Sequence, residues 1–115
     1  MSSEGALHVP DRGQIIAINF DPTVGNEIGK RRPALVMSPK AYNRATGFVL
    51  VCPITTQPRG NPLEVPLTGA RTAGSVLVDR IRSFDWRARQ STLIEKAPAG
   101  LFNEVSLRLM PLIKE

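Results

Sequence analysis

Apolar and β-branched residues recur along this chain in short runs, separated by glycine, proline and polar turn residues. Runs of this length and composition are typical of β-strands. The pattern predicts strands over Gly13–Phe20, Ala34–Met37, Phe48–Thr55, Leu63–Leu67, Ser75–Phe84 and Thr92–Ala97. Most of the regular structure is therefore expected to be a sheet of short strands.

Two segments have a helical pattern instead. Pro39–Thr46 can form one or two helical turns, with proline near its start and Gly47 at its end. Behind Pro98, apolar residues recur at the spacing of one helix face: Leu101, Val105, Leu109 and Leu112. Pro111 must kink or end this helix. The chain as a whole predicts a mainly β fold with a C-terminal α-helix, bent into a small barrel.

The length of 115 residues and a hydrophobic content of 42% support one domain over residues 1–115. Residues 1–10 are a polar lead that we expect to be flexible. No apolar run approaches the length of a membrane span, and the first residues lack the pattern of a signal peptide. We therefore expect a cytoplasmic protein with no membrane partner.

Prolines mark places where a strand is expected to lack a neighbour, because proline has no amide hydrogen to donate. Pro53 predicts an edge position or a bulge within Phe48–Thr55. Thr55, Thr56 and Gln57 should then emerge at the rim of the sheet. Pro66 predicts an edge position for the next strand.

The positive charge of the chain gives information about its binding partner. Fifteen Lys and Arg residues against ten Asp and Glu residues give a formal net charge of +5 and a pI near 10.1. Eleven of the fifteen basic residues are Arg, which suits phosphate and base-edge contacts. An anionic partner is favoured. A general preference for arginine codons would produce the same composition.

The sequence does not contain the residues that several kinds of catalytic site require. A single Cys52, in an apolar run, predicts a buried, reduced core thiol. A single His8 rules out a two-histidine ribonuclease mechanism within one chain, and zinc ligands are too few. The acidic residues are not clustered as a two-metal site requires, and there is no phosphate-binding glycine loop. We expect no metal and no cofactor.

The segment Gly25–Ser38 is the strongest candidate for a site. Two glycines lead into Lys30, Arg31 and Arg32, after which Pro33 starts an extended chain. An Arg held at the end of a strand can grip a phosphate with paired donors and never deprotonates. The alternatives are a solvated cationic turn or an Arg32–Glu27 pair within the loop.

Arg-assisted chemistry is sufficient to cleave RNA. The 2′-hydroxyl of RNA can attack its own phosphodiester, so the protein needs to align it and stabilise the charge that develops. Arg32 would bind the scissile phosphate, and Thr55 would donate a hydrogen bond to a nonbridging oxygen. Glu27 could accept the proton or hold the arginines in place. DNA lacks the 2′-hydroxyl and could not be cut by this route.

Motifs recur in a defined order along most of the chain. In sequence they are Gly13 to Pro22, Gly25-x-Glu27, Arg32-Pro33-Ala34-Leu35-Val36-x-Ser38, Cys52-Pro53-x-Thr55-Thr56, Asp79-Arg80-Ile81-Arg82-Ser83 and Trp86-Arg87-Ala88-Arg89. In this order and spacing they resemble the MazF/PemK family of toxin endoribonucleases from toxin–antitoxin operons. The resemblance runs from about Pro10 to Lys114, with Pro111 a departure inside the terminal helix.

This resemblance implies an SH3-like small barrel that forms homodimers. It also implies metal-independent, sequence-selective cleavage of single-stranded mRNA, leaving a 2′,3′-cyclic phosphate and a 5′-hydroxyl. Arg32 and Thr55 would be catalytic. Glu27, Thr56 and Gln57 stand where the family binds RNA. The basic residues nearby that are also expected to bind RNA are Arg31, Arg59 and Arg82. A cognate MazE-like antitoxin, acidic and partly disordered, would compete for the same surface.

Two other functions fit a basic barrel. A CcdB-type poison of DNA gyrase shares the expected fold and is not catalytic, but it has no use for Arg32-Pro33 or Pro53-x-Thr55. A plain RNA-binding barrel would bind RNA and leave it intact. Arg80 and Arg82, alternating on one face of their strand, are either RNA contacts or a solvated face.

Overall fold

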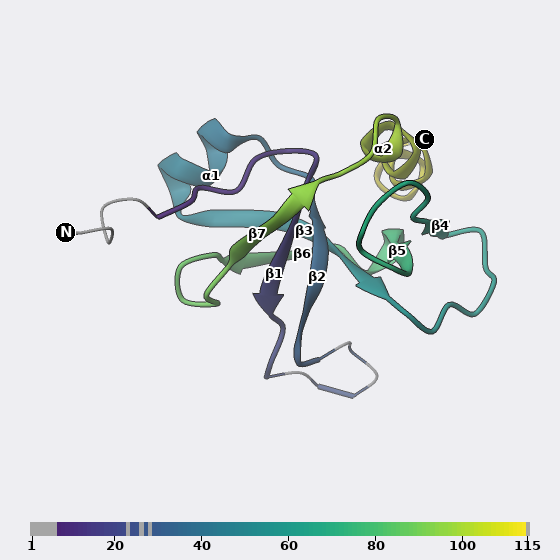
Figure 1. The fold of residues 1–115 in the computed structure, drawn as a ribbon, viewed down its shortest axis with the longest axis horizontal. Helices are drawn as coiled ribbons and strands as arrows, with labels where there is room; N and C mark the ends of the chain where they lie inside the picture. Colours follow the sequence, from purple (N-terminus) through teal and green to yellow (C-terminus); the bar gives the residue numbers. More distant parts are fainter. Residues whose placement is uncertain (1–6, 23, 26, 28, 115) are drawn as a thin grey trace.

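The computed structural model describes residues 7–22, 24, 25, 27 and 29–114, which form a strongly bent antiparallel sheet with two helices (Figure 1). The first six residues of the lead that we expected to be flexible lie outside this part. In chain order the elements are β1 (Gln14–Asn19), β2 (Arg31–Val36), α1 (Lys40–Thr46), β3 (Phe48–Thr55), β4 (Glu64–Pro66), β5 (Ser75–Leu77), β6 (Arg82–Asp85), β7 (Thr92–Lys96) and α2 (Leu101–Ile113).

The strand order is β4-β5-β3-β2-β1-β7, and β6 also pairs with β3. All pairings are antiparallel. Among the described residues the ladder does not close on itself, so the sheet is barrel-like rather than a closed barrel. Pro66 lies in β4 at one end of this order, which confirms its predicted edge position.

Apolar side chains fill both faces of the central strands. Neighbours such as Ile15 and Ile16, or Leu35 and Val36, are fully buried but belong to two different clusters. This follows from the alternation of side chains along a strand. One cluster lies beneath α2, and the other lies on the opposite face, where Phe84 and Trp86 pack.

The predicted strand Ser75–Phe84 is wrong as a single element. It is two strands, β5 and β6, joined by a 3₁₀ turn at Val78–Arg80. Both halves pair with β3: Val76 lies opposite Ile54, and Arg82 lies opposite Val51. The chain therefore uses six steps (76 to 82) against three on β3 (51 to 54). The 3₁₀ turn takes up the difference.

The predicted edge position of Pro53 is also wrong, because β3 is an interior strand. On one side it pairs with β2. On the other side its partner changes from β6, which ends at Val51, to β5, which begins at Ile54. Leu50 directs its amide toward Ser38 on the β2 side, so by alternation Pro53 directs its nitrogen toward this gap. Proline is tolerated there because no partner strand needs a donor.

Both predicted helices are present. α1 ends at Gly47, which has the left-handed backbone that favours glycine. α2 buries Leu101, Val105 and Leu109 and continues through Pro111 for two more residues. Leu112 is not part of the buried face, with an exposed fraction of 53%. Neither of the described helices combines the length and apolar character that a bilayer crossing requires.

Candidate functional site

The two predicted catalytic residues lie just beyond the same end of the β2–β3 ladder. The last pair of this ladder is Ala34 opposite Pro53, and Arg32 and Thr55 each lie two residues beyond it. Side chains two residues apart on a strand point to the same face, so Arg32 shares the face of Ala34 and Thr55 shares the face of Pro53.

Arg32 is half-buried and is held by its own loop. Its Nε donates a hydrogen bond to the carbonyl oxygen of Gly29 at 2.8 Å. Burial lowers the pKa of Arg32, and the nearby Asp21 carboxylate acts in the opposite direction. A guanidinium nevertheless stays protonated in proteins, so the charge is kept. The alternative Arg32–Glu27 pair is not formed, because the Glu27 carboxylate pairs with Arg82.

Arg31, next in the chain, points to the other face of β2. Its Nη2 donates to Oγ1 of Thr92 on β7 at 3.0 Å. Residues 31 and 32 alternate across the sheet, so this contact separates Arg31 from the face that carries Arg32.

Thr55, at the end of β3, is largely buried, and its hydroxyl is oriented by the backbone. Its Oγ1 accepts a hydrogen bond from the amide of Gln57 at 3.1 Å. Because that contact uses the oxygen as an acceptor, the hydroxyl hydrogen remains available for a ligand. Thr56 lies in the exposed bend between these two residues.

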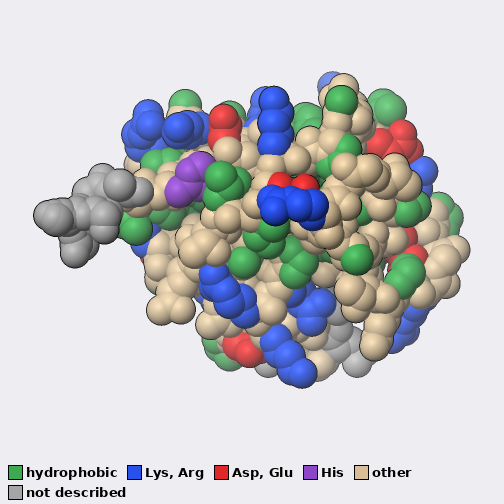
Figure 2. Space-filling model, in the orientation of Figure 1, with side chains coloured by type: hydrophobic (Ala, Val, Ile, Leu, Met, Phe, Trp, Pro, Cys, Tyr) green, Lys and Arg blue, Asp and Glu red, His purple; other side chains and the backbone are tan. Residues whose placement is uncertain are grey.

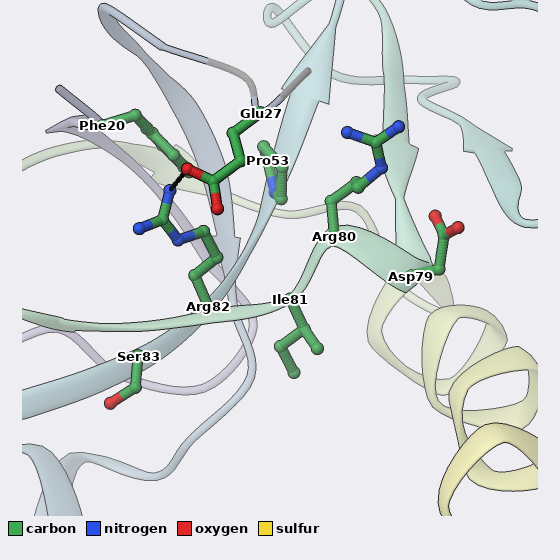
Figure 3. Close-up of a pocket in the computed structure, with 8 residues that line it drawn as sticks. All are labelled: Phe20, Glu27, Pro53, Asp79, Arg80, Ile81, Arg82 and Ser83. Atoms are coloured by element: carbon green, nitrogen blue, oxygen red, sulfur yellow. Dashed lines mark ion pairs between the residues drawn. The ribbon is translucent and has the colours of Figure 1, made fainter. Parts of the chain in front are cut away.

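A pocket of about 370 Å³ opens where β3 changes partner, and we call it the arginine pocket. In Figure 3, Arg80 and Arg82 extend to the same side of the chain, on either side of Pro53, while Ile81 points away. Nη1 of Arg82 lies 3.8 Å from Oε1 of Glu27 and has no hydrogen-bond partner among the described residues. The full lining is Phe20, Glu27, Pro53, Asp79, Arg80, Ile81, Arg82 and Ser83.

A second pocket, of about 380 Å³, adjoins the first, and we call it the loop pocket. Asp79 and Arg80 line both pockets, so the 3₁₀ turn forms the wall between them. The loop pocket is lined by Thr55, Gln57, Arg59, Asn61, Glu64, Leu77, Asp79 and Arg80. Its donors and acceptors make it the more polar of the two.

These positions divide the predicted site residues into groups. Glu27 and Arg82 line the arginine pocket, and Thr55, Gln57 and Arg59 line the loop pocket. The lining of neither pocket includes Arg31, Arg32 or Thr56.

Comparison with known proteins identifies the family of this chain. The family described as "PemK-like, MazF-like toxin of type II toxin-antitoxin system" matches residues 11–113. The chain belongs to this toxin family.

Two relatives from Escherichia coli support the same membership. The chain is 48% identical over 85 residues to the endoribonuclease toxin MazF of strain K12, covering 74% of this chain and 77% of the relative. It is 34% identical over 108 residues to the endoribonuclease PemK, covering 90% of this chain and 81% of the relative.

Solved structures of the MazF type have the same fold. MazF from Deinococcus radiodurans superposes with a TM-score of 0.89 at 45% identity, covering 92% of this chain and 97% of that one. A MazE–MazF complex from the same organism gives 0.82 at 45% identity, covering 92% and 96%. The predicted fold class, mainly β with a C-terminal helix, is confirmed.

Sequence reasoning missed three pocket residues of this MazF-like fold: Asp79, which lines both pockets, and Asn61 and Glu64, which line the loop pocket. Asp79 belongs to the Asp-Arg-Ile-Arg-Ser motif, but the motif was read as part of a continuous strand. Glu64 lies within the predicted strand Leu63–Leu67, and Asn61 lies in the segment before it. A carboxylate shortly after a Gly-Asn turn was the available signal, because such a group can accept the turn's amide hydrogens.

Two glutamates hold loops near the ends of this sheet. Both carboxylate oxygens of Glu64 accept the amide of Arg59, and hydrogen bonds from this backbone lower the pKa of Glu64 despite its burial. Glu95 accepts the hydroxyl and amide of Thr72, and the hydroxyl contact is the main reason its pKa is lowered.

Cys52 is confirmed as a buried, unpaired thiol. Burial raises its pKa to about 12, and the charge of Asp79 adds to the effect. Its Sγ lies 3.8 Å from the carbonyl oxygen of Val78. A thiol in this state is not a nucleophile at neutral pH. Within the described part of the chain, no three His, Cys, Asp or Glu residues are grouped to hold a metal ion.

Gly74 packs directly against the backbone of Thr55. Its φ is +126°, and an added Cβ would overlap the Thr55 carbonyl oxygen and lie 2.9 Å from the carbonyl carbon. Gly69, in the same loop, also has positive φ (+81°), but a Cβ there would meet nothing within 4 Å. Alanine at either position therefore adds backbone strain, but only alanine at position 74 also clashes with Thr55.

We expect Gly69→Ala to cost about 1–2 kcal/mol of unfolding free energy, from backbone strain alone. Gly74→Ala should cost about 1–3 kcal/mol more, because Thr55 must move. Urea unfolding measures both costs, and amide NMR shifts of Thr55 and Gln57 report the displacement. Equal costs with unchanged shifts at Thr55 would contradict the packing role of Gly74.

Glu64 and Glu95 should make stability depend on pH in the acid range. Each pKa lies below its ordinary value of 4.5 in the folded state, so each carboxylate stabilises the fold fully above that value. The contribution is lost as the pH falls through the lower, folded-state pKa. We expect urea unfolding at pH values from about 5 down to about 3 to show this loss. A double variant, Glu64→Gln with Glu95→Gln, should show a flatter profile, and an unchanged slope would count against both assignments.

Proposed function

We propose that this protein is the toxin of a type II toxin–antitoxin system and acts as a sequence-selective, metal-independent endoribonuclease on single-stranded mRNA. One observation carries the proposal. Arg32 and Thr55 lie just beyond the same end of the β2–β3 ladder, and Thr55 lines one of two adjoining pockets with arginine in their walls, in a chain whose relatives are named endoribonucleases.

In the proposed reaction the RNA supplies its own nucleophile. The 2′-oxygen bonds to the adjacent phosphorus, and the bond from phosphorus to the next 5′-oxygen breaks. The 2′-hydroxyl loses a proton and the 5′-oxygen gains one, leaving a 2′,3′-cyclic phosphate and a 5′-hydroxyl. The protein's contribution is alignment and stabilisation of the negative charge on the pentacoordinate phosphorus.

Arg32 and Thr55 are the proposed catalytic residues. Arg32 is held at Nε by the Gly29 carbonyl, so its terminal nitrogens can meet a phosphate. Thr55 receives the Gln57 amide and keeps its own hydrogen for a nonbridging oxygen. Glu27, beside Arg82, is the candidate proton acceptor or the residue that holds that arginine in place.

RNA would continue over the two pockets. Glu27 and Arg82 would contact it at the arginine pocket, and Gln57 and Arg59 at the loop pocket. Thr56, exposed just beyond β3, belongs to the proposed binding set. Arg31 is exposed at the start of β2 but points to the opposite face, so any contact that it makes with RNA would lie apart from these pockets. Lys and Arg side chains also occur in several separate groups over the face seen in Figure 2, which suits a long anion more than a compact one.

The proposed partners follow from the same surface. MazE–MazF complexes are known from Deinococcus radiodurans, and we propose a MazE-like antitoxin that covers the two pockets, where we also propose the groove for RNA. We also propose that the chain forms homodimers, with the groove along the dimer interface. Because mRNA is the proposed substrate, the proposed place of action is the cytoplasm.

Purified protein should cleave a long single-stranded RNA transcript in the presence of EDTA. The new ends should carry a 2′,3′-cyclic phosphate and a 5′-hydroxyl, which mass spectrometry of the fragments identifies. Binding without cleavage would favour a noncatalytic RNA-binding barrel instead. Inhibition of DNA gyrase with intact RNA would favour a CcdB-type poison.

Arg32→Ala and Thr55→Val should each lower kcat/KM for RNA cleavage by at least about a hundredfold, the usual size for loss of a group that stabilises developing charge. Thr55→Ser keeps the hydroxyl and should retain most activity. Arg44→Ala removes a cation from the exposed surface of α1 and serves as the control. Full activity in both Arg32→Ala and Thr55→Val would remove these assignments.

A further inference from the structure

Glu64 is a nearly buried carboxylate at the base of the loop pocket, with an exposed fraction of 8%. The preceding loop, residues 58–63, folds around it. The Arg59 amide donates to both of its oxygens at 3.0 Å, and the Gly60 amide donates to Oε1 at 2.7 Å. Nδ2 of Asn61 donates to Oε2 at 3.3 Å. One carboxylate thus fixes three successive residues.

A second contact holds the same loop from outside. Arg108 of α2 donates to the carbonyl oxygens of Pro62 and Glu64 at 2.7 and 3.3 Å. Its guanidinium is itself held by Glu104 at 2.8 Å. The base of the loop is therefore tied to a helix, while its tip is tied to the Glu64 carboxylate.

The direction of these bonds decides what the loop can offer a ligand. The amides of Arg59 and Gly60 face inward, and the positive φ of Gly60 (+79°) accompanies this inward turn. Successive amides that could have bound a phosphate are already occupied by Glu64. The residues of this loop that line the pocket are Arg59 and Asn61, beside Gln57 and Thr55.

We propose that Glu64 is a positioning residue for RNA recognition, holding the 58–63 loop in the one conformation that presents Arg59 to the substrate beside Gln57. This inference rests on the proposed ribonuclease function and deepens it. Glu64 does not touch RNA. It acts by keeping the binding-competent loop fully populated, so RNA affinity does not include the cost of ordering the loop.

Glu64→Gln removes this hold with little change of shape. One carboxylate oxygen becomes an NH₂ donor that faces amide donors, so part of the contact set becomes donor against donor. The loop then samples other conformations. Because Arg59 is proposed to bind RNA and has no proposed part in the reaction, RNA binding should weaken and the chemical step should stay nearly intact.

Glu95 provides a matched control elsewhere in the molecule. Its carboxylate accepts the amide of Arg71 at 3.2 Å, and the amide and hydroxyl of Thr72 at 2.8 and 2.6 Å. The construction is the same, with one carboxylate binding the amides of a loop, but Glu95 lines neither pocket. Glu95→Gln should therefore loosen a loop without affecting RNA recognition.

The test uses the full chain and an RNA defined by the wild-type protein. Cleavage sites are first mapped on a long single-stranded transcript, and a short RNA containing one site is synthesised. Values of kcat and KM are measured with this RNA, and Kd is measured with the same sequence carrying a 2′-deoxy sugar at the cleaved position. Thermal unfolding is recorded for each variant.

We expect Glu64→Gln to raise KM and Kd by about tenfold or more, with kcat changed by less than about threefold. Glu95→Gln should lower the melting temperature by a similar amount and leave KM and Kd within about twofold. If Glu64→Gln does not fold, Gly60→Ala strains the same loop in open space and should also raise KM and Kd.

Two failures are distinguishable. A wild-type protein that neither binds nor cleaves RNA overturns the proposed function and this inference together. Active wild-type protein with equal KM and Kd in Glu64→Gln and Glu95→Gln overturns the inference alone. A fall in kcat with unchanged Kd would also overturn it, because Glu64 would then act on the chemical step.

Discussion

The exchange of hydrogen-bonding partners along β3 is the constraint on which the site depends. One half of the strand pairs with β6 and the end pairs with β5, and the two partners are consecutive in the chain. Three surplus residues must leave the sheet between them, and they form the 3₁₀ turn that carries Asp79 and Arg80. Proline fits the strand at this point because no donor is required. The arginine pocket opens at this gap in pairing (Figure 3), and the 3₁₀ turn that follows from the gap also lines the loop pocket.

Acidic and basic side chains make different kinds of contact in this fold. Glu27, Glu64 and Glu95 each accept backbone amides and hold a loop. Arginines such as Arg82 and Arg89 lie over the ring of Phe84, which supports a guanidinium without neutralising it. These three carboxylates therefore serve contacts within the fold, and Arg59, Arg80 and Arg82 are among the residues that line the two pockets.

The local sequence was sufficient to predict the strands and helix ends that depend on neighbouring residues. Apolar runs located β1, β3 and β7, and Gly47 and Pro98 marked the limits of the helices. The break within 75–84 could not be read locally, because it follows from a register with β3 that only the folded chain defines. The motifs also identified Arg32 and Thr55 as site candidates. The loop pocket escaped prediction because Glu64 and Asp79 become neighbours of Thr55 only through long-range pairing.

The thiol of Cys52 sits one residue before Pro53, on the strand that both pockets share, and it is fully buried with a pKa of about 12. A thiol-specific reagent can therefore react with it only after the strand has separated from its neighbours. The rate at which the reagent labels Cys52 in the folded protein therefore reports how often this part of the sheet opens. The molecule thus carries its own reporter of local opening at this strand, without any added probe.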